Sequence, residues 1–108
     1  MRFIELIDHL KRPEKTEMLI LNEIPGVEFG LVDIYLRDKL HIESEVRFFD
    51  AEAIPNKLVI EVDGIRYVNL FPLPMTQEMI EEYAKRSDQK FSDKEIAQKL
   101  LDYRIKDA

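Results

Sequence analysis

His41, Glu43 and Glu45 are the residues of this chain whose types and spacing come closest to a chemical site. They alternate with apolar residues over 40–49, LHIESEVRFF, so in a strand all three side chains would point the same way. Asp33 falls in the preceding apolar run and could lie on the neighbouring strand. Two carboxylates and an imidazole can bind a divalent ion or perform acid–base chemistry. However, an exposed alternating strand has the same appearance, which makes a solvated strand face the simpler interpretation.

The chain offers little for nucleophilic or cofactor chemistry. It has no cysteine, which excludes disulfides, thiol nucleophiles and cysteine-ligated metal sites. No G-x-S-x-G sequence is present, and Gly26, Gly30 and Gly64 are too scattered to form a phosphate-binding loop. We therefore predict no catalytic residues, no cofactor and no metal ligands.

The charge of the chain is acidic and unevenly distributed, with a formal net charge of −6. Residues 17–36 contain no basic residue, and their acidic residues are Glu17, Glu23, Glu28 and Asp33. A solvated acidic surface is the simpler interpretation of this segment, and a docking face for a basic partner is the functional one. An acidic chain without a basic stripe argues against nucleic-acid binding, because phosphate neutralisation dominates that affinity.

Residues 91–100, FSDKEIAQKL, resemble the first helix of a helix-turn-helix unit. The resemblance implies a turn and a recognition helix directly afterwards. LDYRIKDA instead continues the same helical period without a turn, and the lysines around the segment are balanced by acidic residues. The sequence therefore predicts no nucleic-acid partner.

Length and hydropathy are those of a small globular protein. At 108 residues, with 45% hydrophobic and 35% charged residues, the chain can bury one core. No apolar run approaches the ~18 residues of a membrane span, and MRFIELIDHLKRPEK lacks the pattern of a signal peptide. We predict a single globular domain over residues 1–108, located in the cytoplasm, with no membrane partner.

Asp63-Gly64 is the strongest structural signal, because it separates two runs of β-branched and aromatic residues over 57–71. With these two residues at the centre of the turn, Glu61 faces Arg66 across the hairpin. One hairpin face is nearly all apolar and is predicted to pack on the core. That face comprises Leu58, Ile60, Val62, Ile65, Tyr67 and Asn69. The other face is charged near the turn and apolar at its base, where we expect a helix or a partner to cover Val59, Val68 and Leu70.

Periodicity assigns the other elements. Segment 14–24 is compatible with a helix or a short strand, and its polar first turn after Pro13 favours the helix. The remaining predictions are a helix at 2–11, strands at 29–36 and 40–49, a helix at 76–85, and a last helix that begins at the S-x-x-E capping box of Ser92. Together they predict an α+β fold, in which an antiparallel four-stranded meander is flanked by one or two N-terminal helices and two C-terminal helices.

These observations favour a small non-enzymatic module for protein interaction or regulation, of the adaptor, inhibitor or immunity type. Its partner-binding candidates are Glu17, Glu23, Glu28, Asp33, Val59, Val68 and Leu70. The expected partner is a basic protein or, through uncovered sheet edges, a second copy of the chain in a homodimer. The alternative is a small enzyme or ligand-binding domain with a pocket between sheet and helices that uses His41, Glu43 and Asp33.

Overall fold

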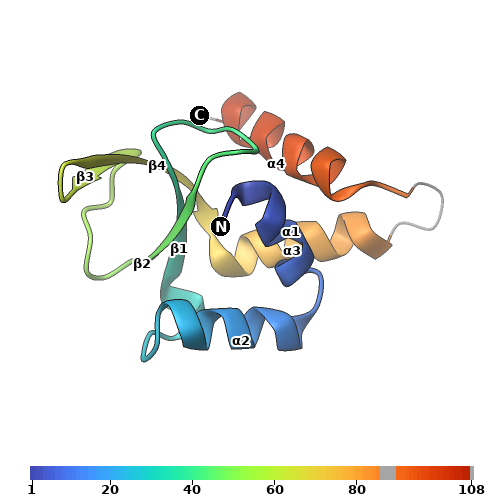
Figure 1. Cartoon of the computed structure of the whole chain (residues 1–108), viewed down its shortest axis with the longest axis horizontal. Coiled ribbons are helices and arrows are strands. Elements are labelled where there is room, and N and C mark those ends of the chain that lie inside the picture. The colour runs from blue at the N-terminus through green and yellow to red at the C-terminus, as the bar shows by residue number, and fades with distance from the viewer. Residues whose placement is uncertain (86–89, 108) are drawn as a thin grey trace.

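A computed structural model describes residues 1–85 and 90–107 of the chain. It contains a four-stranded antiparallel sheet, and the helices gather on one side of this sheet (Figure 1). The helical elements are α1 (Phe3–Leu10), α2 (Pro13–Glu23), the short 3-10 helix η1 (Phe29–Leu31), α3 (Leu73–Lys85) and α4 (Asp93–Asp107). The strands are β1 (Val32–Arg37), β2 (Val46–Asp50), β3 (Val59–Val62) and β4 (Ile65–Pro72). The predicted α+β class is confirmed, and segment 14–24 is helical.

The strand order in the sheet is β2-β1-β4-β3. It differs from that of the predicted meander, because two hairpins meet side by side through β1 and β4. These two strands contain most of the buried side chains of the sheet, whereas β3 is short and largely exposed. A central strand has a neighbouring strand along each of its two edges. The two strands with the most buried side chains occupy these central positions.

Several predicted elements have different boundaries in the structure. Residues 29–31 form η1, so the strand predicted at 29–36 starts only at Val32. The strand predicted at 40–49 is shorter too, since β2 begins at Val46. Helix α3 starts before the predicted residue 76, because Pro74 falls in its first turn, where a missing amide proton has no cost.

The hairpin of β3 and β4 has the predicted register. Its pairs are Val59–Val68, Ile60–Tyr67, Glu61–Arg66 and Val62–Ile65. At the turn, Asp63 and Gly64 both have positive φ, of 54° and 77°. A two-residue type I′ turn requires this left-handed conformation at both positions, and Asp-Gly is among its preferred pairs.

The helices cover the face of this hairpin that contains Val68 and Leu70, for which the sequence left open a helix or a partner as the cover. Leu70, which is 1% exposed, belongs to the main core, and Val68 on the same face is half-buried. Ile60 and Tyr67 are buried as well, but in a second and smaller cluster. Leu58, predicted for the core, is 60% exposed. The prediction that the nearly apolar face packs on the main core was wrong, because both faces of the hairpin contain apolar residues and a hairpin alone does not show which side receives the helices.

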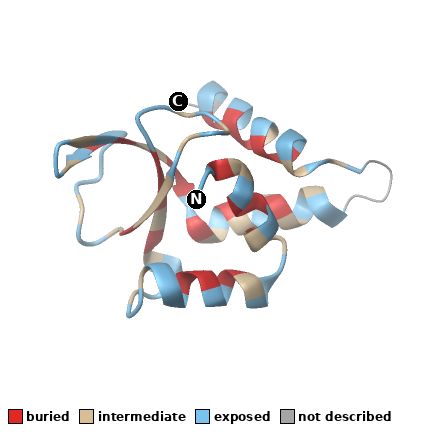
Figure 2. Ribbon diagram, viewed as in Figure 1, coloured by how far each residue is buried: buried red, intermediate tan, exposed pale blue. Residues whose placement is uncertain are grey.

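The main core lies between the helices and this face of the sheet, and Figure 2 shows the buried residues on the inward sides of the helices. α1 is central to it, with Phe3, Leu6, Ile7 and Leu10 all fully buried. Their spacing of three and four residues places them on one side of the helix. The other members are Leu19, Ile20, Val32, Ile34, Leu36, Leu70, Phe71, Leu73, Ile80, Ile96, Ala97, Leu100 and Leu101.

The second cluster covers the other face of the sheet and consists of Tyr35, Phe49, Ile60 and Tyr67. The Phe49 ring makes edge-to-face contacts with Tyr35 and Tyr67, at centroid distances of 5.3 and 5.5 Å. The guanidinium of Arg47 lies 4.8 Å from the Phe49 centroid, and its Nη1 donates to the Tyr67 hydroxyl at 3.1 Å. The Tyr35 hydroxyl donates to the Lys57 carbonyl at 3.2 Å, which fastens the loop between β2 and β3 over this face.

The predicted capping box at the start of α4 is present. The Glu95 amide donates to Ser92 Oγ at 3.1 Å, and the Ser92 amide donates to Glu95 Oε1 at 3.0 Å. The hydrogen bonds from Ser92, that of its backbone amide first, hold the pKa of Glu95 below its ordinary value of 4.5. The carboxylate therefore stabilises the folded state at neutral pH, and this contribution is lost as the pH falls through the depressed pKa.

We expect Ser92→Ala to lower the free energy of unfolding by about 1 kcal/mol, because the Glu95 amide loses its side-chain acceptor. Glu95→Gln should in addition flatten the loss of stability below about pH 4.5. Urea denaturation between about pH 3 and pH 7 measures both effects. Lys94→Ala, at an exposed position of the same turn, is the control and should change the stability by less than about 0.5 kcal/mol. An equal loss in the control would contradict the capping role.

Candidate interaction site on helix α2

The segment that contains His41, Glu43 and Glu45 does not form a strand face, contrary to the prediction. Its backbone instead completes the start of α1, where the amides of Phe3 and Ile4 donate to the carbonyls of Ser44 and Ile42, both at 2.9 Å. Amides in the first turn of a helix have no partner within the helix. The segment therefore leaves the sheet to satisfy them.

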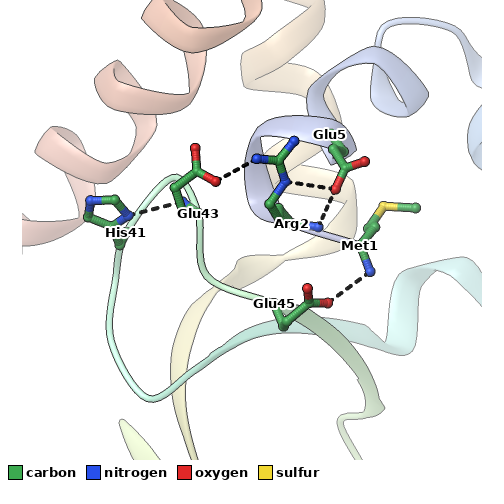
Figure 3. Close-up of polar contacts among 6 residues, drawn as sticks. All are labelled: Met1, Arg2, Glu5, His41, Glu43 and Glu45. Atoms are coloured by element: carbon green, nitrogen blue, oxygen red, sulfur yellow. Dashed lines mark hydrogen bonds and ion pairs between the residues drawn. The ribbon is translucent and has the colours of Figure 1, made fainter.

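The polar side chains of this segment form hydrogen bonds and ion pairs, as Figure 3 shows. Arg2 donates to Glu43 at 2.6 Å and to Glu5 at 3.1 Å. The amino-terminal ammonium group donates to Glu45 at 3.0 Å, and His41 Nδ1 accepts the amide proton of Glu43 at 3.0 Å. The hydrogen bond to Glu43 is the main reason why the pKa of Arg2 is raised. These groups hold the segment and α1 together.

Asp33 lies away from that segment, near the start of β1. The segment follows the other end of the strand, and four residues of extended chain separate Asp33 from Arg37 by about 13 Å. Asp33 is half-buried, and burial raises the pKa of its carboxyl group. The structure therefore does not bring Asp33 together with His41 and Glu43. Within residues 1–85 and 90–107, no group of three histidine or acidic residues could hold a metal ion.

Among the apolar partner-binding candidates, only one is well exposed. Val59 is 43% exposed on the edge strand β3, and its partner Val68 is half-buried. Leu70 is 1% exposed and is buried in the main core. Its burial by the helices is the direct result of the hairpin orientation described above.

The acidic candidates Glu17, Glu23 and Glu28 are all exposed on α2 or directly before η1. In the part of the chain that the structure describes, none of these three carboxylates forms an ion pair. The nearby base Lys15 donates to Asp8 at 2.8 Å, so its charge is compensated by α1. These exposed carboxylates are distributed over α2 and the position directly before η1.

α2 lies at the periphery of the molecule, with one side toward α1 and the other toward solvent (Figures 1 and 2). A groove with a volume of 360 Å³ lies between α2, η1 and the start of α3. Its walls are mostly apolar, as is usual for binding sites of this size. They are formed by Pro13, Thr16, Glu17, Ile20, Leu21, Val27, Phe29 and Gln77.

Two polar side chains in this groove are fixed by hydrogen bonds. The Thr16 hydroxyl is buried and lies 3.1 Å from the carbonyl oxygens of His9 and Arg12, which can accept its proton. A threonine within a helix commonly bonds back to the preceding turn in this way. Gln77 Nε2 donates to the same hydroxyl at 2.6 Å. This bond connects α3 to α2 and fixes the shape of the groove.

Large apolar side chains remain exposed on α2 and at η1. Met18 is 68% exposed, Leu21 63% and Phe29 41%. A second groove of 250 Å³ lies along α2 as well, lined by His9, Lys15, Met18, Leu19 and Asn22. The sequence analysis identified Glu17 but missed these apolar residues. The run Met18-Leu19-Ile20-Leu21 contained the signal, since four consecutive apolar residues in a helix cannot all face one core.

No protein-family model, curated protein or solved structure matches this chain. Among the helices of the described residues, none combines the length and the apolar character that a bilayer crossing requires. The class of protein is therefore defined by the fold and the site alone. The chain has an α+β fold with a peripheral helix that exposes both apolar and acidic side chains.

Proposed function

We propose that this chain is a small cytoplasmic protein-interaction module, of the adaptor, inhibitor or immunity type, that binds a basic segment of a partner protein on α2. The observation that carries the proposal is the exposure of Leu21 and Phe29 at the 360 Å³ groove and of Met18 at the second groove along α2. Exposed apolar patches with polar surroundings are typical of interaction sites.

The chemistry of the groove supports binding of a protein segment. A catalytic pocket needs several convergent polar groups around a reacting atom. Here the Thr16 hydroxyl and the Gln77 amide are bonded to each other, and Glu17 is the one ionisable side chain among the lining residues. The apolar walls can instead receive an aliphatic or aromatic anchor, the kind of residue that dominates binding at protein interfaces.

The charge near the groove favours a basic partner. Glu17 lines the groove, Glu23 is exposed at the end of α2 and Glu28 directly before η1, and no basic residue occurs within residues 17–36. Complementary charge at the rim of an interface speeds association and selects the partner, and salt screens the effect. Binding should therefore weaken as the ionic strength rises.

A pair of basic peptides tests the proposal. Both contain leucine and lysine in equal number over about 14 residues, one with helical and one with alternating spacing of leucine. We expect at least one of them to shift the amide NMR signals of Glu17, Leu21 and Phe29. Replacement of lysine by glutamate in both peptides should abolish these shifts, because the carboxylates would then repel the peptide.

Two matched pairs of variants locate the site. Leu21→Ser should weaken peptide binding about tenfold or more, because a buried leucine side chain contributes about 1.5–3 kcal/mol. Leu58→Ser, at a leucine of similar exposure elsewhere, should leave binding unchanged. Glu17→Gln should reduce the salt dependence of binding, and Glu61→Gln on β3 should not. If neither basic peptide binds, or if the control variants weaken binding equally, the proposal is wrong.

A further inference from the structure

α2 has an inward and an outward side. Successive residues of a helix are rotated by about 100°, which places Thr16, Leu19 and Ile20 together on the side toward the core. All three are buried. The residues on the outward side are Glu14, Glu17, Met18 and Leu21, and all of them are exposed.

The two grooves lie on opposite flanks of this outward side. The residues of α2 that line the first groove are Pro13, Thr16, Glu17, Ile20 and Leu21, which form one stripe of the helix. Those that line the second are Lys15, Met18, Leu19 and Asn22, which form the opposite stripe. Leu21 borders the first groove and Met18 borders the second. Together these two side chains form an apolar ridge between two grooves.

A ridge between two grooves is the surface that one helix offers to another. Helices pack by placing rows of side chains into the grooves beside a row of the partner, at interaxial distances of about 8–10 Å. α2 has 11 residues and is about 16 Å long, so it can contact about three turns of a partner helix. An extended segment, in contrast, gains its affinity from backbone hydrogen bonds to a sheet edge. The backbone of α2 is already hydrogen-bonded within the helix.

The negative charge of the carboxylates on α2 indicates which kind of partner helix can bind there. A second copy of the chain that packed α2 against α2 would add its own Glu14 and Glu17 to an interface that already contains these two carboxylates. Like charges across an interface disfavour association. Lysine or arginine residues beside an apolar stripe would instead meet these carboxylates favourably. We infer that the partner segment is a basic amphipathic helix that packs along the ridge of Met18 and Leu21, an inference that rests on the function proposed above.

The two leucine–lysine peptides separate this inference from the proposed function. They have the same composition, but only the peptide with helical spacing can form an apolar stripe on a helix. We expect it to bind at least tenfold more tightly than the alternating isomer, with a gain in peptide helicity by circular dichroism. Met18→Ser and Leu21→Ser should each weaken this binding, because the two residues contact opposite sides of the peptide helix.

The other outcomes are distinct. Equal or tighter binding of the alternating isomer on α2 would overturn the helix inference and leave the proposed function standing. Failure of both peptides would overturn both. Sedimentation of the chain alone tests whether a second copy of the chain occupies the ridge. A dimer that Leu21→Ser dissociates and Leu58→Ser does not would assign the ridge to a second copy and overturn the inference of a basic helix.

Discussion

Leu70→Ala is expected to lower the free energy of unfolding by about 3 kcal/mol, which is a large part of the ~5–15 kcal/mol of a typical domain. Leu70 lies in the main core, on the face of β4 that the helices cover. Its truncation removes apolar contacts and leaves a cavity, because the surrounding residues relax only in part. Urea denaturation at neutral pH, followed by circular dichroism, measures the loss.

Leu58→Ala is the matched control for this prediction. Leu58 precedes β3 in the same hairpin and is largely exposed, so its truncation should cost less than about 0.5 kcal/mol. The comparison tests which face of the hairpin receives the helices. If Leu58→Ala were the more destabilising change, the orientation predicted from the sequence would be right and the one in the structure wrong.

Phe49→Ala should destabilise the protein by about 3 kcal/mol or more, although no helix covers this residue. The Phe49 ring contacts Tyr35 and Tyr67 edge-to-face and lies beneath the Arg47 guanidinium. Aromatic pairs of this geometry contribute about 0.5–1.5 kcal/mol beyond the burial of their area. Loss of the central ring removes both pairs together and leaves a cavity on the outer face of the sheet.

Phe29→Ala provides the control for Phe49→Ala, because it removes the same side chain from an exposed position. We expect it to cost less than about 1 kcal/mol in the isolated protein. Arg47→Ala should fall between the two, since a cation–π contact contributes about 0.5–2 kcal/mol. If Phe49→Ala cost no more than Phe29→Ala, the second cluster would not contribute to stability.

The sequence by itself determined the features that depend on neighbouring residues. The register of the β3–β4 hairpin follows from Asp63-Gly64, because few residue pairs adopt two consecutive left-handed conformations. The start of α4 follows from Ser92 and Glu95, which satisfy the first amides of their own helix. The apolar spacing in α1 determined one fully buried side of a helix. In each case the partners are at most a few residues apart in the chain.

The alternation over 40–49 shows where local patterns are insufficient. It is present in the sequence, yet Ile42 and Ser44 supply carbonyl oxygens to the first turn of α1 and do not pair in the sheet. The competing hydrogen bonds come from a segment about 40 residues away. The strand order and the side of the hairpin that the helices cover also depend on distant segments. The order depends on the pairing of β4 with β1, and the covered side depends on where the helices pack.

The candidate site combines both kinds of information. The acidic character of residues 17–36 was readable from the sequence, because the charge of a side chain does not depend on its neighbours in space. The groove was not readable, since Phe29 and Gln77 reach α2 only through the fold. The exposure of Met18 and Leu21 is likewise a tertiary result. The core covers only one side of α2, where Thr16, Leu19 and Ile20 are buried, and Met18 and Leu21 on the other side remain exposed.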